Sequence, residues 1–200
     1  MKLKKLGVAL AILCSISGPI YSQQDKKVEE ICYNPNARGD TSKRSIKSAA
    51  VGKISGANVT INYHSPGVRK RFIWGALVPY DEVWVTGAHK ATSIEVDKSF
   101  IVGGKTIPAG KYALFTIPGK SMWTVIINRR WDQHLTDDYE KKDDVVRLKV
   151  KLIKQNKLIE RLQYFIAPAK GNTGTITIEW EKIRIAFPII VPAEKNPASI

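Results

Sequence analysis

The sequence predicts an all-β protein, folded as one antiparallel β-sandwich of jelly-roll-like architecture behind a flexible N-terminal tether. The first observation is a hydrophobic period of two, in which apolar and polar residues alternate, as in residues 146–152 and 176–180. Such alternation is typical of a strand with one face in the core and the other in water. The second observation is that turn residues interrupt the alternation at short intervals. The third is that no long helical pattern separates the segments.

The clearest alternating segments, which we predict as strands, are residues 59–63, 94–96, 123–127, 146–152, 162–166 and 176–180. Gly103-Gly104 lies between two shorter apolar segments and suits a two-residue hairpin that needs positive φ. Two further turns are expected at residues 108–110 and 118–121, where proline and glycine gather. After residue 180 the apolar set continues one residue late, so Glu181-Lys182 is expected to form a turn or a bulge.

Length and composition point to one globular domain. The 200 residues are 44% hydrophobic and 25% charged, which is ordinary for a folded chain. We expect about nine or ten short strands, with a helix open as an alternative within residues 132–144 or 154–162. Each large apolar side chain that is buried contributes about 1.5–3 kcal/mol, so a core of this size is sufficient without disulfides.

The first 22 residues have the pattern of a secretory signal peptide. Three lysines within residues 1–5 precede an apolar stretch of about a dozen residues, and a small residue lies at Ser22. We therefore expect cleavage near Ser22 and an exported protein, located in the periplasm, at the cell surface or outside the cell. The apolar stretch is shorter than the roughly 20 residues that span a bilayer, so no transmembrane segment is expected.

The mature chain is then expected to have three parts. Residues 23–48 are polar and lack hydrophobic periodicity, which predicts a polar tether. Residues 49–192 contain the alternating segments and form the predicted β-sandwich domain, and residues 193–200 form a polar tail. Removal of the signal peptide would take Cys14 away and leave Cys32 as the one thiol, so no intrachain disulfide is expected.

The chain is strongly basic, with 32 lysines and arginines against 18 acidic residues and a formal net charge of +14. Removal of the signal peptide takes three lysines and no acid, and lowers this charge to +11. We expect an exported basic protein to attract anionic partners, namely an anionic glycan, lipopolysaccharide or an acidic envelope protein. Nucleic acid is not expected, because the sequence contains no recognition motif for it.

Motifs of the common enzyme classes are absent from the sequence. It lacks His-Glu-x-x-His, Gly-x-Ser-x-Gly, the glycine-rich phosphate loop that ends in Gly-Lys-Ser/Thr, and Cys-x-x-Cys. The expectation therefore leans toward a non-catalytic protein without a cofactor. The alternative is a metal-dependent enzyme in which His64, His89 and His134 converge on zinc or copper, since three imidazoles and one open position make a catalytic site.

The leading interpretation is an exported binding module for an anionic or carbohydrate ligand or an envelope partner. The residues expected to bind are Arg69, Arg71, Tyr80, Trp84, His89 and Lys90. The two arginines lie in a short basic turn, where a planar guanidinium suits carboxylate or phosphate. The aromatics lie in the irregular segment 74–92, and aromatics with a polar handle often form ligand platforms. The structural alternative is that these aromatics plug the end of the sandwich and that the cations are generic surface charge.

Short motifs spread over residues 45–188 follow a known pattern. They include Val78-Pro-Tyr80, Val83-Trp84, Thr86-Gly-Ala88, Pro108-Ala-Gly-Lys-Tyr112 and Trp123-Thr-Val-Ile126. The chain thereby resembles a bacterial family of exported proteins, domain-of-unknown-function family twenty-nine eleven, with the pattern Val-Pro-Tyr-x-x-Val-Trp-x-Thr-Gly-Ala. The resemblance implies an exported, β-rich domain and supplies no catalytic residues.

The sequence departs from that family pattern directly after Trp84. The family reads Trp-Arg-Thr-Gly-Ala-Asn-Glu, whereas this chain has Val85 in place of the arginine and His89-Lys90 in place of Asn-Glu. Joint loss of an arginine and a glutamate suggests a charge pair abandoned as a unit, because one partner left buried alone is costly. If that pair forms a shared family site, we expect the site to be altered or lost in this protein.

Overall fold

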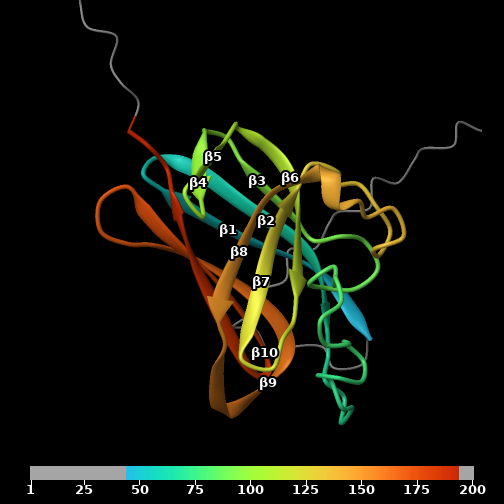
Figure 1. Ribbon diagram of the computed structural model, residues 1–200. Helices are drawn as coiled ribbons and strands as arrows, with labels where there is room; N and C mark the ends of the chain where they lie inside the picture. The colour runs from blue at the N-terminus through green and yellow to red at the C-terminus, as the bar shows by residue number, and fades with distance from the viewer. Residues whose placement is uncertain (1–43, 194–200) are drawn as a thin grey trace, which may run out of the picture.

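A computed structural model describes residues 44–193, which form a sandwich of two antiparallel β-sheets (Figure 1). The predicted all-β antiparallel sandwich is confirmed. The predicted signal peptide at residues 1–22, most of the predicted tether at 23–48 and nearly all of the predicted tail at 193–200 lie outside the described residues. Within the described residues, no helix is long and apolar enough to cross a membrane.

The larger sheet has the strand order β1-β2-β3-β6-β7-β8, and all neighbours in it are antiparallel. Its strands are β1 (Ser45–Ile54), β2 (Ala57–Pro66), β3 (Ser93–Val96), β6 (Gly110–Ile117), β7 (Met122–Asn128) and β8 (Asp144–Lys151). Short turns join β1 to β2 and β6 to β7. Two connections are long, residues 67–92 between β2 and β3 and residues 129–143 between β7 and β8, and these connections build the candidate site.

The smaller sheet has the order β5-β4-β10-β9. Its strands are β4 (Phe100–Val102), β5 (Lys105–Ile107), β9 (Ile153–Pro168) and β10 (Thr173–Ile190). Figure 1 shows β9 and β10 as the long orange and red strands that cross the whole sandwich. β9 lies against β1 and β2 of the larger sheet, and β10 lies against β8.

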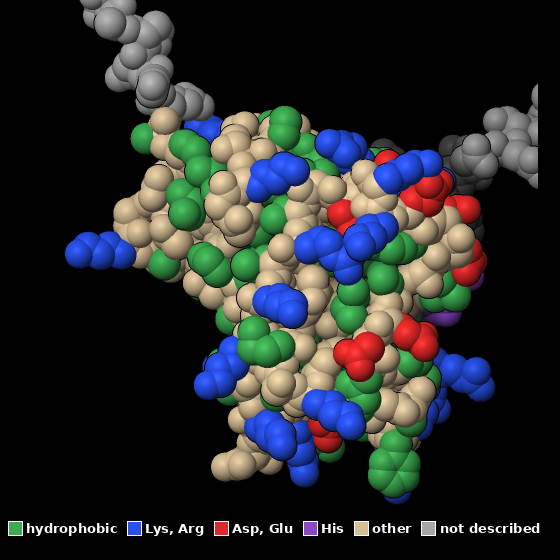
Figure 2. All heavy atoms as spheres, in the orientation of Figure 1, with side chains coloured by type: hydrophobic (Ala, Val, Ile, Leu, Met, Phe, Trp, Pro, Cys, Tyr) green, Lys and Arg blue, Asp and Glu red, His purple; other side chains and the backbone are tan. Residues whose placement is uncertain are grey.

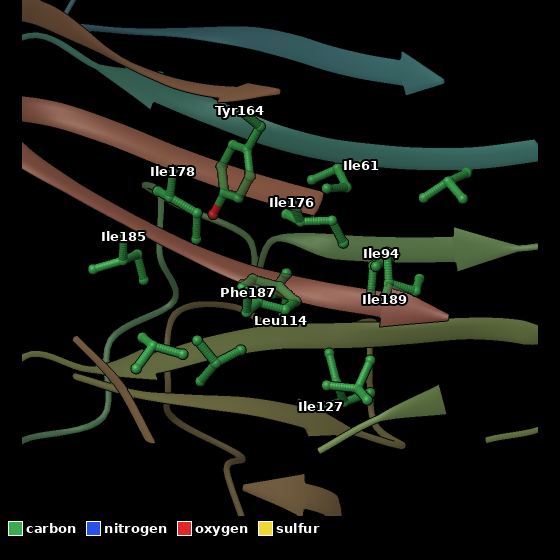
Figure 3. Close-up of a cluster of buried hydrophobic side chains, with 14 of the residues drawn as sticks. Ile61, Ile94, Leu114, Ile127, Tyr164, Ile176, Ile178, Ile185, Phe187 and Ile189 are labelled. Atoms are coloured by element: carbon green, nitrogen blue, oxygen red, sulfur yellow. The ribbon is translucent and has the colours of Figure 1, made fainter. Parts of the chain in front are cut away.

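The core lies between the two sheets and is made by the inward face of each strand. The side chains labelled in Figure 3 are buried and come from both sheets; they are Ile61, Ile94, Leu114 and Ile127 on one side and Tyr164, Ile176, Ile178, Ile185, Phe187 and Ile189 on the other. Burial of each such side chain contributes about 1.5–3 kcal/mol.

Four tryptophans of the described residues continue this core near the start of β7. They are Trp74, Trp84, Trp123 and Trp180, with ring centroids 4.9–6.2 Å apart. Most of the pairs meet edge to face, which places the positive ring edge against the negative face of a neighbour. Large side chains from both sheets and from the 67–92 connection therefore close this end of the core.

The two sheets approach each other closely where β1 crosses β9. A Cβ added to Gly52 would lie 2.7 Å from Ile166 Cγ2 and 2.9 Å from Ile166 Cβ, so no larger residue fits there without movement of β9.

The hairpin predicted at Gly103-Gly104 is present in the smaller sheet. Gly103 and Gly104 have φ of 58° and 78° and join β4 to β5, as a type I′ hairpin requires.

The phase slip at Glu181-Lys182 is a β-bulge. Register shifts flank Glu181 in the pairing of β10 with β9, and Glu181 has φ of 56°. The backbone N–H of Lys182 donates to Glu181 Oε2 at 2.6 Å. The predicted alternatives were a turn or a bulge, and the bulge lets β10 continue as one strand past the slip.

Two expectations differ from the structure. Residues 45–48, predicted as the end of the tether, are the first residues of β1. Their alternation is weak because the inward positions opposite β9 are small, among them Ser48, Ala50 and Gly52. No helix forms in residues 154–162, which belong to β9, and residues 132–144 contain only a 3-10 turn at Lys141–Asp143.

Candidate functional site

The outer face of the larger sheet is partly covered by residues 80–92 and 129–143. A second apolar cluster lies under this cover, and it consists of Val85, Ala91, Ala113, Phe115 and Ile126. The cover does not extend over β1, where Val51 is 69% exposed. The outer face is therefore shielded from solvent under the cover and exposed to solvent at β1. The candidate site lies at the boundary between these two parts.

A short extended segment positions the first edge of the cover. Trp84 and Thr116 exchange backbone hydrogen bonds at 2.8 and 3.0 Å, so the chain pairs with β6 beside the start of β3. Alternation in this segment sends Trp84 inward to the tryptophans and Val85 outward to the second cluster. Thr86 is again internal, and its carbonyl accepts a hydrogen bond of 2.6 Å from the Tyr164 hydroxyl.

A groove of about 590 Å³ lies where the cover ends. Its floor is the outer face of β1, β2, β3 and β6, and its walls are residues 89–91 and 131–134. We call it the outer-face groove, and its lining residues are Lys47, Ser48, Ala49, Asn62, Tyr63, His64, His89, Lys90, Ala91, Ser93, Lys111, Trp131, Asp132 and His134. A volume of this size is typical of sites for small molecules.

His89 belongs to the first wall of the groove, and its side chain contacts residues of the floor. Its φ of 61° turns the chain sharply away from the sheet. Its Nε2 is 2.8 Å from Ser45 Oγ, and its ring lies 5.3 Å from the ring of His64, edge to face. The carbonyl of His89 accepts a hydrogen bond of 2.6 Å from the backbone N–H of Leu135. These contacts hold one imidazole over β1 and β2 and join it to the opposite wall.

The second wall is joined to the first by two contacts. The backbone N–H of Ala91 donates to the Gln133 carbonyl at 3.0 Å, and Lys90 Nζ lies 3.2 Å from Asp132 Oδ1. Both charged side chains are about two-thirds exposed, so the ion pair orients them and adds little stability. The walls are thus linked through the backbone, which defines the width of the groove.

Trp131 supplies the aromatic surface of the groove. It is 40% exposed, and Lys111 Nζ lies 4.0 Å from the centre of its ring. A cation at this distance is attracted by the ring quadrupole, by about 0.5–1 kcal/mol at an exposed site. The contact brings an ammonium group and an indole face to the same part of the groove.

Positive charge dominates the lining. The lining contains three lysines, Lys47, Lys90 and Lys111. Asp132 is the one acidic residue among the described lining residues, and it is itself paired with Lys90. Asn62 and Ser93 add neutral hydrogen-bonding side chains to the floor. A site with this lining can bind a negatively charged molecule that also carries hydroxyl groups.

The structure divides the six predicted binding residues. His89 and Lys90 line the groove. Arg69 and Arg71 lie in the turn after β2, away from the groove, and the Arg71 guanidinium donates to the carbonyls of Gly67 and Val68 at 2.6 and 3.2 Å. The two arginines and the groove residues therefore lie apart, because the turn and the groove belong to different parts of the long β2–β3 connection.

The two predicted aromatics have structural surroundings. Trp84 is partly buried against the other tryptophans of the core, and its indole N–H donates to the Gly87 carbonyl at 3.1 Å. Tyr80 is half-buried against Gly75, at which an added Cβ would lie 2.8 Å from the tyrosine ring. Neither lines the groove, so the alternative that these aromatics close the end of the sandwich describes them better.

The three histidines of the alternative prediction all line the groove. His64 and His89 are neighbours, whereas His134 Nδ1 is 3.2 Å from Asp137 Oδ2 on the opposite wall. Within residues 44–193, no group of three histidine, cysteine, aspartate or glutamate side chains is placed to hold a metal ion. The histidines thus share one groove without forming a common ligand set there.

Apart from His64, the lining residues that come from strands were not identified from the sequence. Lys47, Asn62 and Lys111 lie on β1, β2 and β6, far apart in sequence, and reach the groove because their strands are neighbours or near neighbours in one sheet. Trp131 reaches the groove from the β7–β8 connection. Alternation identifies such residues as outward-facing, but the strand order is needed to place them on one face.

The loop before β8 is held by charged contacts. Tyr139 donates to Asp144 Oδ2 at 2.8 Å, and Arg147 Nη1 lies 2.9 Å from the same oxygen. Burial, with a further contribution from Asp144, raises the pKa of Tyr139 to about 12. Glu140 and Lys142 form an ion pair that lowers the pKa of the glutamate and raises that of the lysine. Cations and a phenol therefore already satisfy several carboxylates of this loop.

Fold and groove together define an all-β sandwich protein with a basic, aromatic-lined groove on the outer face of its larger sheet. The chain belongs to the family described as protein of unknown function (DUF2911), whose sequence profile matches residues 45–189. The resemblance drawn from the short motifs is thereby confirmed. No curated protein and no solved structure shows a significant match to the chain.

The position at which this chain departs from the family pattern lies in the cover. Val85 is 3% exposed in the second apolar cluster, and Lys90 pairs with Asp132 at the surface. An arginine at position 85 would need a charged partner under the cover, because an unpaired buried charge is costly. The joint loss of such a pair stays a prediction, and restoring Val85→Arg together with Lys90→Glu tests it through any change in ligand binding.

Proposed function

We propose that this protein is an exported, non-catalytic binding module and that the outer-face groove holds an anionic carbohydrate. The observation that supports this most directly is the lining: Lys47, Lys90 and Lys111 face a space that contains one acid, Asp132, among its described residues. An acidic glycan and the sugar–phosphate part of lipopolysaccharide share the chemistry that such a lining favours, namely anionic groups next to hydroxyl groups.

The groove offers a distinct role for each kind of side chain. The ammonium groups attract carboxylate or phosphate, with the interaction screened beyond about 8 Å at physiological salt. Asn62 and Ser93 can exchange hydrogen bonds with sugar hydroxyls, and the exposed part of the Trp131 ring offers an apolar face for a sugar ring. The rest of the floor, formed by rigid strands, keeps these groups in fixed positions.

Export is the second part of the proposal. It is supported by the basic and apolar pattern of residues 1–22 and by small residues near Ser22. In the periplasm, at the cell surface or outside the cell, acidic glycans and lipopolysaccharide are accessible partners for a protein of formal charge +14 before processing. An acidic envelope protein is a partner of a different class and is an outcome of the test below.

Trp131 provides the readout for an experiment. It is the tryptophan of the groove, while the four others pack together in the core, so ligand binding is expected to change the fluorescence of Trp131 alone. We would titrate purified protein with digalacturonate, with lipopolysaccharide and, as the neutral control, with maltose. We expect saturable quenching by the anionic ligands and none by maltose, with no signal change in Trp131→Phe.

Charge variants make the experiment decisive. Lys47→Gln/Lys111→Gln is expected to weaken binding by about 100-fold or more, since charge-assisted hydrogen bonds contribute roughly 1.5–3 kcal/mol each and two of them are removed. Lys105→Gln/Lys170→Gln removes the same charge from two hairpins outside the groove and should bind like the parent protein. The groove would be refuted as the binding site if both double variants weakened binding equally. It would also be refuted if neither anionic ligand bound saturably. Capture of an acidic protein through the groove would assign the partner to the other class.

A metal-dependent enzyme is the second candidate function. It is supported by one observation, that His64, His89 and His134 line the same groove. Elemental analysis of protein purified without an affinity tag tests it. Stoichiometric zinc or copper, lost on substitution His64→Ala, would favour the enzyme over the binding module.

A further inference from the structure

One end of the sandwich exposes large hydrophobic side chains. Of those that are exposed within residues 44–193, this end carries Phe72, Leu77, Met122, Ile153 and Leu158. Phe72 is 88% exposed, and the other four are 43–48% exposed. Single exposed apolar residues are ordinary, but a gathering of several at one end of a folded protein marks an interaction surface.

Backbone hydrogen bonds show that these residues come from adjoining segments. Val68 N–H donates to the Glu160 carbonyl at 2.7 Å, which joins the turn after β2 to β9. Leu152 N–H donates to the Ser121 carbonyl at 3.1 Å, which joins the β8–β9 junction to the β6–β7 turn. Asp81 N–H donates to the Pro118 carbonyl at 2.8 Å and links that turn to the β2–β3 connection.

We call this surface the basic–apolar end and define it as residues 69–77, 118–122 and 151–158. In Figure 1 these segments lie together at the lower end of the molecule, where the β2–β3 connection projects farthest. The outer-face groove is lined by other residues and has none in common with the basic–apolar end.

A tight turn holds Phe72 away from the core. Arg69 and Lys70 have φ of 51° and 58°, and Arg71 N–H donates to the Val68 carbonyl at 3.0 Å, as in a type I′ turn. The Arg71 guanidinium donates to the carbonyls that precede the turn, so its side chain closes the turn further. The exposure of Phe72 is therefore built into the backbone.

The residues after the turn are anchored as well. Ile73 and Val78 are 3% exposed, and Val78 N–H donates to the Ile73 carbonyl at 2.9 Å. Leu77 N–H donates to the Phe72 carbonyl at 3.3 Å, which places the two exposed residues side by side. The buried pair fixes the small loop, and the exposed pair points away from the apolar core.

Cations surround the exposed apolar side chains. The exposed cations of this end are Arg69, Lys70, Arg71, Lys120, Lys151, Lys154 and Lys157. Figure 2 shows Lys and Arg side chains on the lower part of the molecule, where a hydrophobic group projects, with Asp and Glu side chains among them. The nearby acids are Asp81 and Glu82, which are exposed, and Glu160, whose Oε1 already accepts the backbone N–H of Arg69 at 2.9 Å.

We propose that the basic–apolar end docks on a lipid bilayer whose headgroups carry anionic phosphates. Phe72 and Leu77 enter the membrane–water interface, where removal of their apolar side chains from water is favourable. The cations remain at the level of the phosphates. Two observations favour this occupant. A soluble polyanion would offer no apolar environment for the projecting Phe72 side chain. A second copy of the chain would bring the same cations together, and these would repel one another.

Co-sedimentation with vesicles tests the proposal on the full chain. The probes are vesicles of phosphatidylcholine with about a third phosphatidylglycerol and vesicles of phosphatidylcholine alone. We expect salt-sensitive binding to the anionic vesicles and little binding to the neutral ones. Phe72→Ser is expected to weaken binding by about tenfold, while Val51→Ser, at another exposed apolar position, should leave it unchanged.

A charge variant isolates the electrostatic part. Arg69→Asn/Lys70→Asn removes two cations but keeps residues that tolerate positive φ, so the turn is retained. About 1 kcal/mol per cation near an anionic surface is roughly fivefold, so this variant should bind about 25-fold more weakly. Lys105→Gln/Lys170→Gln, which removes the same charge elsewhere, should change binding by less than about threefold.

Several results would overturn membrane docking. They are absence of binding to the anionic vesicles, equal binding to both kinds of vesicle, and equal losses in the test and control variants. A concentration-dependent dimer that Phe72→Ser dissolves would assign this end to a second copy instead. Unchanged vesicle binding by Lys47→Gln/Lys111→Gln is expected, because those residues belong to the groove, and it separates this proposal from the proposed ligand site.

Discussion

Two tyrosines show how single residues couple the cover to the core. Tyr164 crosses from β9 to the Thr86 carbonyl, and its burial raises the pKa of the phenol well above its usual value. Tyr139 lies at the edge of the second cluster, with its ring 5.3 Å from Phe115 and its hydroxyl on Asp144. Each hydroxyl is held as a hydrogen-bond donor, so each contact requires the neutral phenol.

Because of Tyr139, the stability of the cover is expected to fall at alkaline pH. Because its pKa is raised to about 12 in the folded protein, from 10.0, the neutral form is favoured on folding. The contribution is therefore complete below pH 10 and is lost as the pH rises through about 12. Urea unfolding of the parent protein and of Tyr139→Phe at about pH 8 and about pH 11 measures it. We expect the parent to lose more stability than the variant, and parallel losses would contradict the assignment.

At the scale of elements, two connections and one bulge decide what the sheet can do. The 67–92 connection contributes Trp84 to the core, His89 to the groove and Phe72 to the basic–apolar end. The 129–143 connection supplies the opposite wall of the groove. The bulge at Glu181 lets β10 stay continuous although the phase of its inward residues changes. Strands supply the scaffold, and irregular backbone supplies the candidate sites.

The bulge gives a prediction about β10. Position 181 has positive φ, which asparagine tolerates and a β-branched residue does not. Glu181→Val is expected to destabilise the protein by about 1–2 kcal/mol, whereas Glu181→Asn should stay within about 0.5 kcal/mol of the parent. Both variants remove the carboxylate that accepts the Lys182 N–H, so urea unfolding of the pair isolates the backbone effect. Equal stability of the two variants would show that the positive φ is unimportant.

At the scale of the whole molecule, cohesion comes from burial between two sheets. Both cysteines of the chain, Cys14 and Cys32, precede the described residues, so no disulfide lies within residues 44–193. The inward faces of the strands form one continuous core, and the second cluster on the outer face fastens the cover to it. A domain of this size is stable on such burial alone.

This cohesion predicts insensitivity to reduction. The midpoint of thermal unfolding should change by less than about 1 °C when dithiothreitol is added, because no cross-link contributes to the fold. Differential scanning calorimetry of the purified chain, with and without reductant, provides the measurement. A clear fall of the midpoint in dithiothreitol would reveal a disulfide that joins Cys14 to Cys32 or links two chains.

Some site residues could be predicted from the sequence and others could not. His89 and Lys90 stood out because they belong to one irregular segment dense in unusual residues, and the structure places both in the groove. Trp84, from the same segment, turned inward because alternation there follows the pairing with β6. Lys111 carried no local signal at all, since an outward lysine on a strand looks the same on any part of the surface.

The sequence by itself determined most of the strands and turns, the place of the phase slip and the family, because hydrophobic period and turn chemistry act between residues close in the chain. Only the tertiary structure decided which outward residues meet. Strand order brings β1, β2 and β6 under two distant connections and creates the groove, while the same fold separates Arg69 from His89 within one connection. The physical reason is that sheet pairing and packing are long-range, so local patterns fix which way a side chain faces but not its neighbours.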